Sequence, residues 1–254
     1  GPFRTHAVPV NVGALAKAHD ALFIVDCVSS AGADEIDVEG CNIDFFSSSS
    51  SKAIGAYPGL SFVVGRAKAF EALKHNPVKS AYLNLAAFYD FLKTRSQTPN
   101  TPAVQLIYAL NAALANILAE GPANRRATIR RRAGLLRVGM QRMGLKFLIG
   151  QAGMSAVLTT VLAPPATDVG ALRRKLRQKS VIIYEGKGPL AGRVFQVGNI
   201  GEISDGDIAT FLSVLKSALG GQPPEPIGVL PNPRPTARRA GHHTLHLAPA
   251  AKAS

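Results

Sequence analysis

The sequence predicts an α/β fold in which short buried strands alternate with helices. Two apolar runs, residues 22–25 and 43–46, are separated by turn-forming residues, and each run ends in polar residues. Runs of this length between turn signals are typical of buried parallel strands. Over residues 145–219, apolar stretches alternate again with segments of helical spacing. We therefore expect a mostly parallel sheet in a first domain and a smaller α+β domain after it.

The first domain is expected to span residues 1–122. Residues 12–19 suit the end of a helix, a third strand over 59–64 follows a Pro-Gly turn, and a helix is expected over 66–75. Residues 77–96 suit short helical pieces. A long apolar helix is expected to begin at Pro102, with Thr101 as its N-cap, and to end at Gly121.

The second domain is expected to span residues 123–219. It begins with a helix over 123–143, and the apolar segments 146–149, 155–163, 181–184 and 193–198 suit strands. Residues 168–179 suit a helix. The last helix begins at Ser204, with Asp207 placed to complete a capping box. Residues 220–254 are rich in proline and alanine, so we expect them to be a disordered tail.

Composition excludes several classes of protein. The absence of a long apolar run argues against a membrane span, and the N-terminus has no secretory pattern, so a cytoplasmic location is expected. Two cysteines, Cys27 and Cys41, argue against a disulfide scaffold. His242, His243 and His246 lie in the tail without a nearby thiol or carboxylate, so no metal site is expected.

The formal net charge of +13 raises the question of a nucleic-acid partner. Ten of the 29 lysines and arginines are concentrated in two segments, "NRRATIRRR" at 124–132 and "RRKLRQK" at 173–179, where apolar residues recur at helical spacing. We interpret these segments as solvated helix faces and expect no nucleic-acid partner, because no aromatic-rich basic patch or DNA-binding motif accompanies them. A basic binding module that acts by charge alone remains the alternative.

Two reactive side chains stand where the first two strands end. Asp26 follows the first apolar run, and Lys52 follows five serines after the second. Because ligands of open α/β sheets bind at the carboxyl ends of the strands, both side chains are expected at one sheet edge. A lysine that forms a Schiff base and an aspartate that holds a pyridinium nitrogen are what pyridoxal 5'-phosphate requires.

Four blocks resemble the class V branch of the pyridoxal-phosphate aminotransferases, which includes alanine–glyoxylate, serine–pyruvate and 2-aminoethylphosphonate–pyruvate transaminases. The blocks are "VDCVSSAG" at 25–32, "SSKAIGAYPGLSFVVG" at 50–65, "QTPNTPAVQLIYAL" at 97–110 and "GKGPLAGRVFQVGNIGEI" at 186–203. The resemblance implies a fold-type I transferase that moves an amino group from a small amine or amino acid to a 2-oxo acid. It also implies a homodimer with shared sites.

The resemblance assigns catalytic roles to Lys52 and Asp26 and places Ser29, Thr98 and Thr101 at the cofactor. Thr98 and Thr101 would reach the cofactor phosphate of the neighbouring subunit, and a helix start near Thr101 would suit an anion. Hydroxyl groups and backbone amides bind phosphate, so Ser50 and Ser51 are further candidates. Ser51 is a departure, because relatives often carry an amide side chain directly before the lysine.

Gln196 is the second departure from the family pattern. Many relatives carry an arginine at this position, which binds the substrate carboxylate through paired hydrogen bonds. Because glutamine lacks the charge and "VGNIGE" resembles the 2-aminoethylphosphonate subgroup, we expect transfer from 2-aminoethylphosphonate to pyruvate. Alanine–glyoxylate or serine–pyruvate exchange is the alternative. The resemblance begins late in the family pattern, so a fragment is also expected, and an inactive remnant that only pairs with another subunit stays open.

Overall fold

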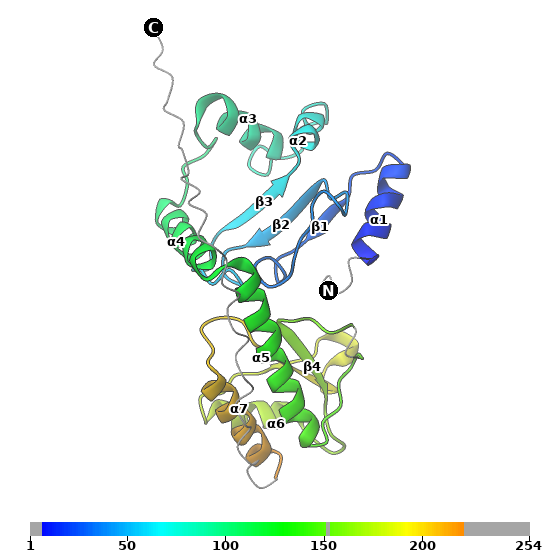
Figure 1. Cartoon of the computed structure of the whole chain (residues 1–254), viewed down its shortest axis with the longest axis vertical. Coiled ribbons are helices and arrows are strands. Elements are labelled where there is room, and N and C mark those ends of the chain that lie inside the picture. Colours follow the sequence, from blue (N-terminus) through cyan, green and yellow to red (C-terminus); the bar gives the residue numbers. More distant parts are fainter. Residues whose placement is uncertain (1–6, 151–152, 221–254) are drawn as a thin grey trace, which may run out of the picture.

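The computed structural model describes residues 7–150 and 153–220, which form two small sheets joined by two long helices (Figure 1). The first sheet lies at one end of the molecule with helices around it. The second sheet and its helices lie at the other end. The α/β architecture is as predicted, and the expected tail at 220–254 lies, apart from its first residue, outside the described residues.

The first sheet has the order β1-β2-β3 and mixes both directions of pairing. β1 (Ile24–Asp26) and β2 (Phe45–Ser49) run parallel, with Asp26 opposite Ser47. β3 (Ser61–Gly65) pairs with β2 in the antiparallel direction. The parallel pair was expected, and the antiparallel third strand follows from the short turn after the serines, which is too short for a parallel crossover.

The first two strands are shifted relative to the apolar runs that predicted them. β2 begins at Phe45 and continues through Ser47, Ser48 and Ser49, so serines expected after the strand lie within it. Ser48 is buried and donates its hydroxyl proton to the Cys27 carbonyl, 3.3 Å away, which explains how a polar run is accommodated in a strand. β1 is not buried on both faces, because Ile24 is 63% exposed.

The core under this sheet joins β1, β2 and the loops that follow them. It contains Val25, Cys27, Ala31, Cys41, Ile43, Ile54 and Ile117. Helix α1 (Ala7–Ala18) packs closely, since a Cβ atom added at Gly13 would meet the Cys41 carbonyl oxygen. Both cysteines are free and buried, and burial raises the pKa of each thiol.

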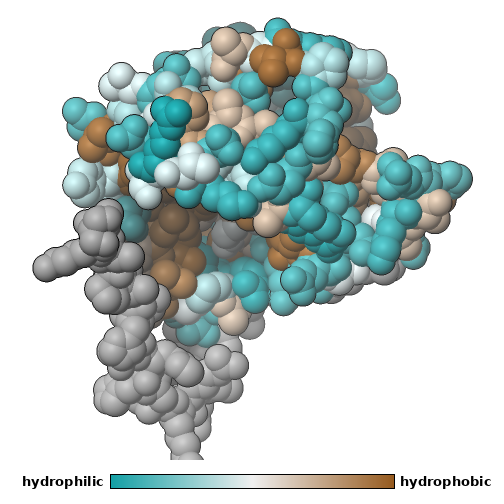
Figure 2. Space-filling view, turned by 90° about the horizontal axis from the view of Figure 1, so that it is seen from above, coloured by the Kyte–Doolittle hydropathy of each residue, from teal (hydrophilic) through white to brown (hydrophobic). Residues whose placement is uncertain are grey.

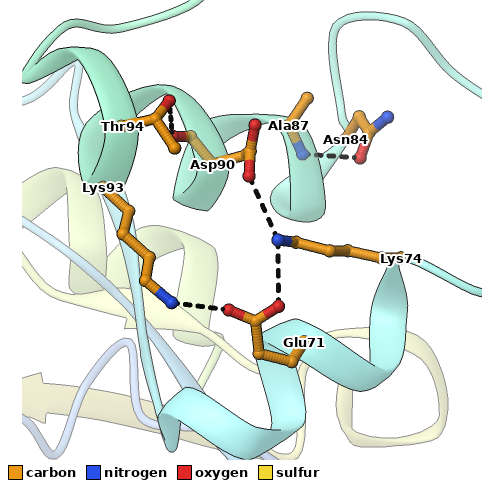
Figure 3. A network of polar contacts seen from close by, with 7 residues as sticks. All are labelled: Glu71, Lys74, Asn84, Ala87, Asp90, Lys93 and Thr94. Carbon is orange, nitrogen blue, oxygen red and sulfur yellow. Dashed lines mark hydrogen bonds and ion pairs between the residues drawn. The ribbon is translucent and has the colours of Figure 1, made fainter.

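Two helices beyond β3 are joined by a network of charges (Figure 3). The Glu71 carboxylate of α2 (Ala67–Leu73) lies 2.9 Å from Lys74 Nζ and 2.9 Å from Lys93 Nζ of α3 (Leu85–Arg95). Lys74 also reaches Asp90, 3.1 Å away. The rings of Phe70 and Tyr89 stack between the helices, so ionic and aromatic contacts hold the pair together.

Two long helices connect the sheets. α4 (Val104–Glu120) and α5 (Pro122–Arg142) meet at Gly121, whose φ of +87° suits glycine, with a bend of 87°. The expected cap was wrong: α4 starts two residues after Pro102, and its N-cap is Ala103, which has no side chain to accept a backbone proton. No single helix of the described chain is long and apolar enough to cross a membrane, and α4 and α5 pass that test only as a bent pair.

The second sheet is antiparallel and has the order β4-β6-β5. Its strands are β4 (Leu158–Leu162), β5 (Tyr184–Glu185) and β6 (Val194–Gly198). The strand expected over 146–149 is reduced to one bridge between Phe147 and Val161. A short 3-10 turn, η2 (Gly188–Leu190), separates β5 from β6.

Three helices build a core with one face of this sheet. Leu135, Leu136 and Met140 of α5 meet α6 (Val169–Arg177), α7 (Asp205–Ala218) and the Phe195 ring of β6. Arg131 of α5 also donates two hydrogen bonds, each 2.7 Å long, to the Asp205 carboxylate at the start of α7. This pair lowers the pKa of Asp205 and raises that of Arg131.

The capping box expected at Ser204 is present, and its removal should be measurable. The Ser204 hydroxyl accepts from the Asp207 N–H at 3.1 Å, while the Asp207 carboxylate accepts from the Ser204 N–H at 2.7 Å. We expect Ser204→Ala to lower the free energy of unfolding by about 1 kcal/mol, measured by urea titration. Ser217→Ala, an exposed position inside α7, is the matched control. Equal stability of the two variants would contradict the capping role.

The charge network between α2 and α3 gives a prediction for acid solution. Hydrogen bonds from Lys74 and then Lys93 lower the pKa of Glu71 from 4.5 to about 2. Because the folded pKa lies below the unfolded one, the network contributes to stability above about pH 4.5 and loses that contribution as the pH falls toward 2. In a carbon-detected NMR titration, Lys74→Met and Lys93→Met should each raise the Glu71 pKa, whereas Lys68→Met on the same helix should leave it unchanged.

Candidate functional site

The candidate site is built on the parallel pairing of β1 and β2. The Cys27 N–H donates to the Ser47 carbonyl at 2.8 Å, which extends the ladder one residue past Asp26. The loops that follow the two strands therefore leave the sheet at the same edge. Asp26 ends β1 and is exposed, and one of its carboxylate oxygens accepts from the Val28 N–H at 2.9 Å, which fixes the first turn of its loop.

A tight turn after β2 carries Lys52. The Gly55 N–H donates to the Lys52 carbonyl at 3.0 Å, and the Ala56 N–H donates to the Ser50 carbonyl at 2.9 Å. The next two residues, Ala53 and Ile54, are only 3% and 5% exposed, whereas the Lys52 side chain is exposed. The backbone of the lysine is thus anchored while its amine stays accessible.

The loop after β1 is in contact with the lysine turn. A Cβ atom built on Gly32 would lie 3.3 Å from the Ala53 carbonyl carbon, and the φ of Gly32 is +88°, so this close approach suits glycine. Ile54 shares its core with Val25 and Cys27. The structure therefore brings the Asp26 loop and the Lys52 turn together, as the sequence predicted.

The serines divide into those that hold the backbone and those that remain accessible. Ser50 Oγ lies 2.6 Å from the Tyr57 carbonyl and 3.3 Å from the Leu60 carbonyl, so its single proton closes the lysine turn. Ser29 is exposed and Ser51 is half-buried. Their hydroxyls make no hydrogen bond within the described residues, which leaves them available to a ligand.

The two threonines lie in the loop before α4. Thr98 donates its hydroxyl proton to the Asn100 carbonyl at 2.7 Å, and Thr101 is exposed. The start of α4 lies beside the segment that follows the Lys52 turn, because a Cβ atom built on Gly59 would come 2.7 Å from the Leu106 side chain. The loop is thus attached to the same part of the molecule as Lys52.

Gln196 belongs to the second sheet. Its side chain is half-buried on β6 and points its amide toward Thr160 Oγ1 of β4, 3.4 Å away. Ile200, four residues later, packs with Ala53, Ala33, Ile129, Ala156 and Val157 in a small core between the sheets. Because four residues of extended chain span roughly 13 Å, the Cα atom of Gln196 lies at most about that far from the Cα atom of Ile200, which packs in the same small core as Ala53.

Asn199 is a residue of this region that sequence reasoning missed. It is 1% exposed, and its amide donates to the carbonyls of Ala156 at 2.9 Å and Ile129 at 3.3 Å. It thereby ties the end of β6 to α5 and to the segment before β4. Its neighbour Ile200 then meets the lysine turn. The only sequence signal was its place between two glycines in "GNIG".

These residues match one family over most of the chain. The family described as class-V aminotransferases matches residues 7–186, so the chain belongs to this family. An uncharacterized aminotransferase of Methanocaldococcus jannaschii is 34% identical over 211 residues, covering 82% of this chain and 55% of the relative. A 2-aminoethylphosphonate–pyruvate transaminase of Klebsiella pneumoniae is 30% identical over 213 residues, covering 82% of this chain and 58% of the relative.

The solved structures agree with the fold. The alanine–glyoxylate aminotransferase from Nostoc sp. superposes with a TM-score of 0.77 at 28% identity, covering 82% of this chain and 56% of that one. The fold is therefore that of the fold-type I aminotransferases. The chain spans a little more than half the length of the relatives it matches.

The residues present fit pyridoxal 5'-phosphate, the cofactor that the family implies. An accessible amine, an accessible carboxylate and two unbonded hydroxyls lie on loops from one sheet edge. This donor set suits a cofactor with an aldehyde, a pyridine nitrogen and a phosphate. Among the described residues, no cluster of three His, Cys, Asp or Glu side chains suits a metal ion.

The two serines before the lysine should respond differently to mutation. Ser50→Ala removes the donor that the Tyr57 carbonyl uses, and we expect the free energy of unfolding to fall by about 1–3 kcal/mol. Ser51→Ala removes a hydroxyl without a partner and is the control. Hydrogen exchange of the amides of Gly55 and Ala56 should speed up in the first variant only. Equal exchange in both variants would mean that the Ser50 hydroxyl does not hold the turn.

Proposed function

We propose that this chain carries the lysine-bearing part of a pyridoxal-phosphate transaminase, which moves an amino group from a small amine or amino acid to a 2-oxo acid. The observation that carries the proposal is the placement of Asp26 and Lys52 on touching loops at one sheet edge, in a chain of this family. The bound cofactor would supply an electron sink for the bond that breaks at the substrate carbon.

Each residue has a separate task in this proposal. Lys52 would hold the cofactor through its amine, and the same amine would hold and move the proton at the substrate carbon. Asp26 holds a positive charge on the pyridine nitrogen, because a carboxylate next to a cation stabilises its charged form. Ser29, Ser51, Thr98 and Thr101 are the proposed hydroxyl contacts of the phosphate, while Ser50 is proposed to act mainly by closing the lysine turn.

The proposed donor is 2-aminoethylphosphonate and the proposed acceptor is pyruvate. Support comes from the uncharged Gln196, which bonds Thr160 and offers no positive charge to an α-carboxylate. Similarity to the Klebsiella pneumoniae enzyme points the same way. The likeness to the Nostoc sp. structure supports alanine and glyoxylate as the alternative pair.

A homodimer is part of the proposal. Helix α4 exposes a row of large apolar side chains, and Figure 2 shows hydrophobic surface on the side of the molecule where this helix lies. The exposed side chains are Val104, Ile107, Tyr108, Leu114 and Leu118. A row of this kind at the helix that follows Thr98 and Thr101 suits contact with a second subunit.

Cofactor titration tests the proposal directly. We expect the full chain to gain a saturable visible absorbance band on addition of pyridoxal 5'-phosphate, and Lys52→Ala to lose it. Lys68→Ala, an exposed lysine on α2, is the control for adventitious attachment. Asp26→Asn should weaken binding at least tenfold, about 1.4 kcal/mol. A folded chain without the band would leave only the inactive remnant that pairs with another subunit.

The donor is tested on the chain once it holds the cofactor. Addition of 2-aminoethylphosphonate alone should bleach the visible band in a single turnover, and pyruvate should restore it. Bleaching by alanine or serine but not by the phosphonate would replace the proposed donor with the alternative one.

A further inference from the structure

The positive charge of the chain is concentrated in its second part. Residues 123–219 hold sixteen lysines and arginines but five aspartates and glutamates, whereas residues 7–122 hold eight and ten. The first part is therefore slightly acidic, and almost the whole net charge belongs to the part built around the second sheet. Such asymmetry between two parts of a chain is typical of a protein with a polyanionic partner.

Four of the five acidic groups of the second part are already engaged. Asp205 is held by Arg131 at 2.7 Å, and Asp207 completes the capping box of α7. Glu185 lies 3.4 Å from Arg173, and Asp168 caps α6 and lies 3.9 Å from Arg174. These contacts neutralise only part of the positive charge, and no cation of this part is among the residues proposed for the transamination site.

Helix α6 and the residues after it expose six of these sixteen cations. Val169, Leu172 and Leu176 of α6 are buried in the core, which turns the rest of the helix toward solvent. We define the α6 basic surface as the exposed residues Arg173, Arg174, Lys175, Arg177, Lys179 and Lys187. The last four have no acidic partner within the described part of the chain. Lys187 joins the surface because Glu185, two residues before it, contacts Arg173.

We propose that the α6 basic surface binds the phosphate backbone of nucleic acid without reading its sequence. The four cations from Arg173 to Arg177 extend over roughly 6 Å of helix axis, and Lys179 follows in the turn after the helix. A DNA duplex carries roughly four negative charges over that length, which matches the four cations of the helix. The surface lies at the end of the molecule away from the β1–β3 sheet (Figure 1), so this binding is independent of the proposed transamination.

A nucleic acid suits this surface better than a membrane does. The apolar side of α6 is occupied by the protein core, so the helix cannot insert into a bilayer. The six members of the surface are lysines and arginines, so the proposed contacts are to phosphate groups and not to bases. Binding should therefore depend on charge alone and decline steeply with salt. The structure confirms the solvated helix face predicted for α6, and the proposal assigns a partner to it.

The test is fluorescence anisotropy of a labelled DNA duplex of about 25 base pairs, titrated with the full chain from about 50 to 200 mM salt. We compare the triple variant Lys175→Ala, Arg177→Ala, Lys179→Ala with a control of equal charge change, Lys17→Ala, Lys68→Ala, Lys79→Ala. The α6 variant should bind more weakly, and its plot of log affinity against log salt should be shallower by about 2.7. The control should retain the wild-type slope.

Three outcomes of this experiment would overturn the proposal. Equal losses in both triple variants would mean that net charge alone attracts DNA and that α6 forms no specific surface. Absence of measurable binding by the wild-type chain at the lowest salt would remove the surface as a binding site. Binding to vesicles containing phosphatidylserine, without binding to DNA, would assign it to a membrane. Circular dichroism of both variants verifies that they fold, and none of these results affects the cofactor titration.

Discussion

The burial of Ala53 and Ile54 is the contact on which the rest of the site depends. Ile54 belongs to the core under the first sheet, and Ala53 belongs to the small core that also contains Ile129 and Ile200. The lysine before them is therefore fixed by both parts of the molecule at once. An exposed side chain on a buried backbone combines access with a defined position, which is what a covalent attachment site requires.

The polar residues near the site are of two kinds: some are buried or hydrogen-bonded to the backbone, and others have accessible side chains. Ser48 donates its hydroxyl proton to the Cys27 carbonyl, and Ser50 donates its own to the Tyr57 carbonyl. Because these hydroxyls are hydrogen-bonded, serines can occupy a buried strand and the tight turn after it. Asn199 does the same for the end of β6. Polar residues near the site are thus mainly structural, and the chemistry falls to the few that remain accessible.

The sequence allowed the α/β fold, the capping box at Ser204 and the meeting of the Asp26 and Lys52 loops to be predicted. A helix cap depends on residues that are close together in the sequence. The ends of parallel strands share one edge of a sheet, so residues just after two predicted strands can be expected to meet. The extension of β2 into the serines, the weak pairing at Phe147 and the late start of α4 could not be predicted. The first two depend on partners distant in sequence, Cys27 for Ser48 and Val161 for Phe147.

Helix α5 has a consequence for how the molecule comes apart. Its first turns supply Ile129 to the core between the sheets, and its later turns supply Leu135, Leu136 and Met140 to the core of the second sheet. The helix is thus shared by two hydrophobic clusters, and if it separates from one cluster it also exposes apolar surface of the other. Heat or denaturant should therefore melt the two sheets together as one cooperative unit, with the lysine turn dissolving in the same step.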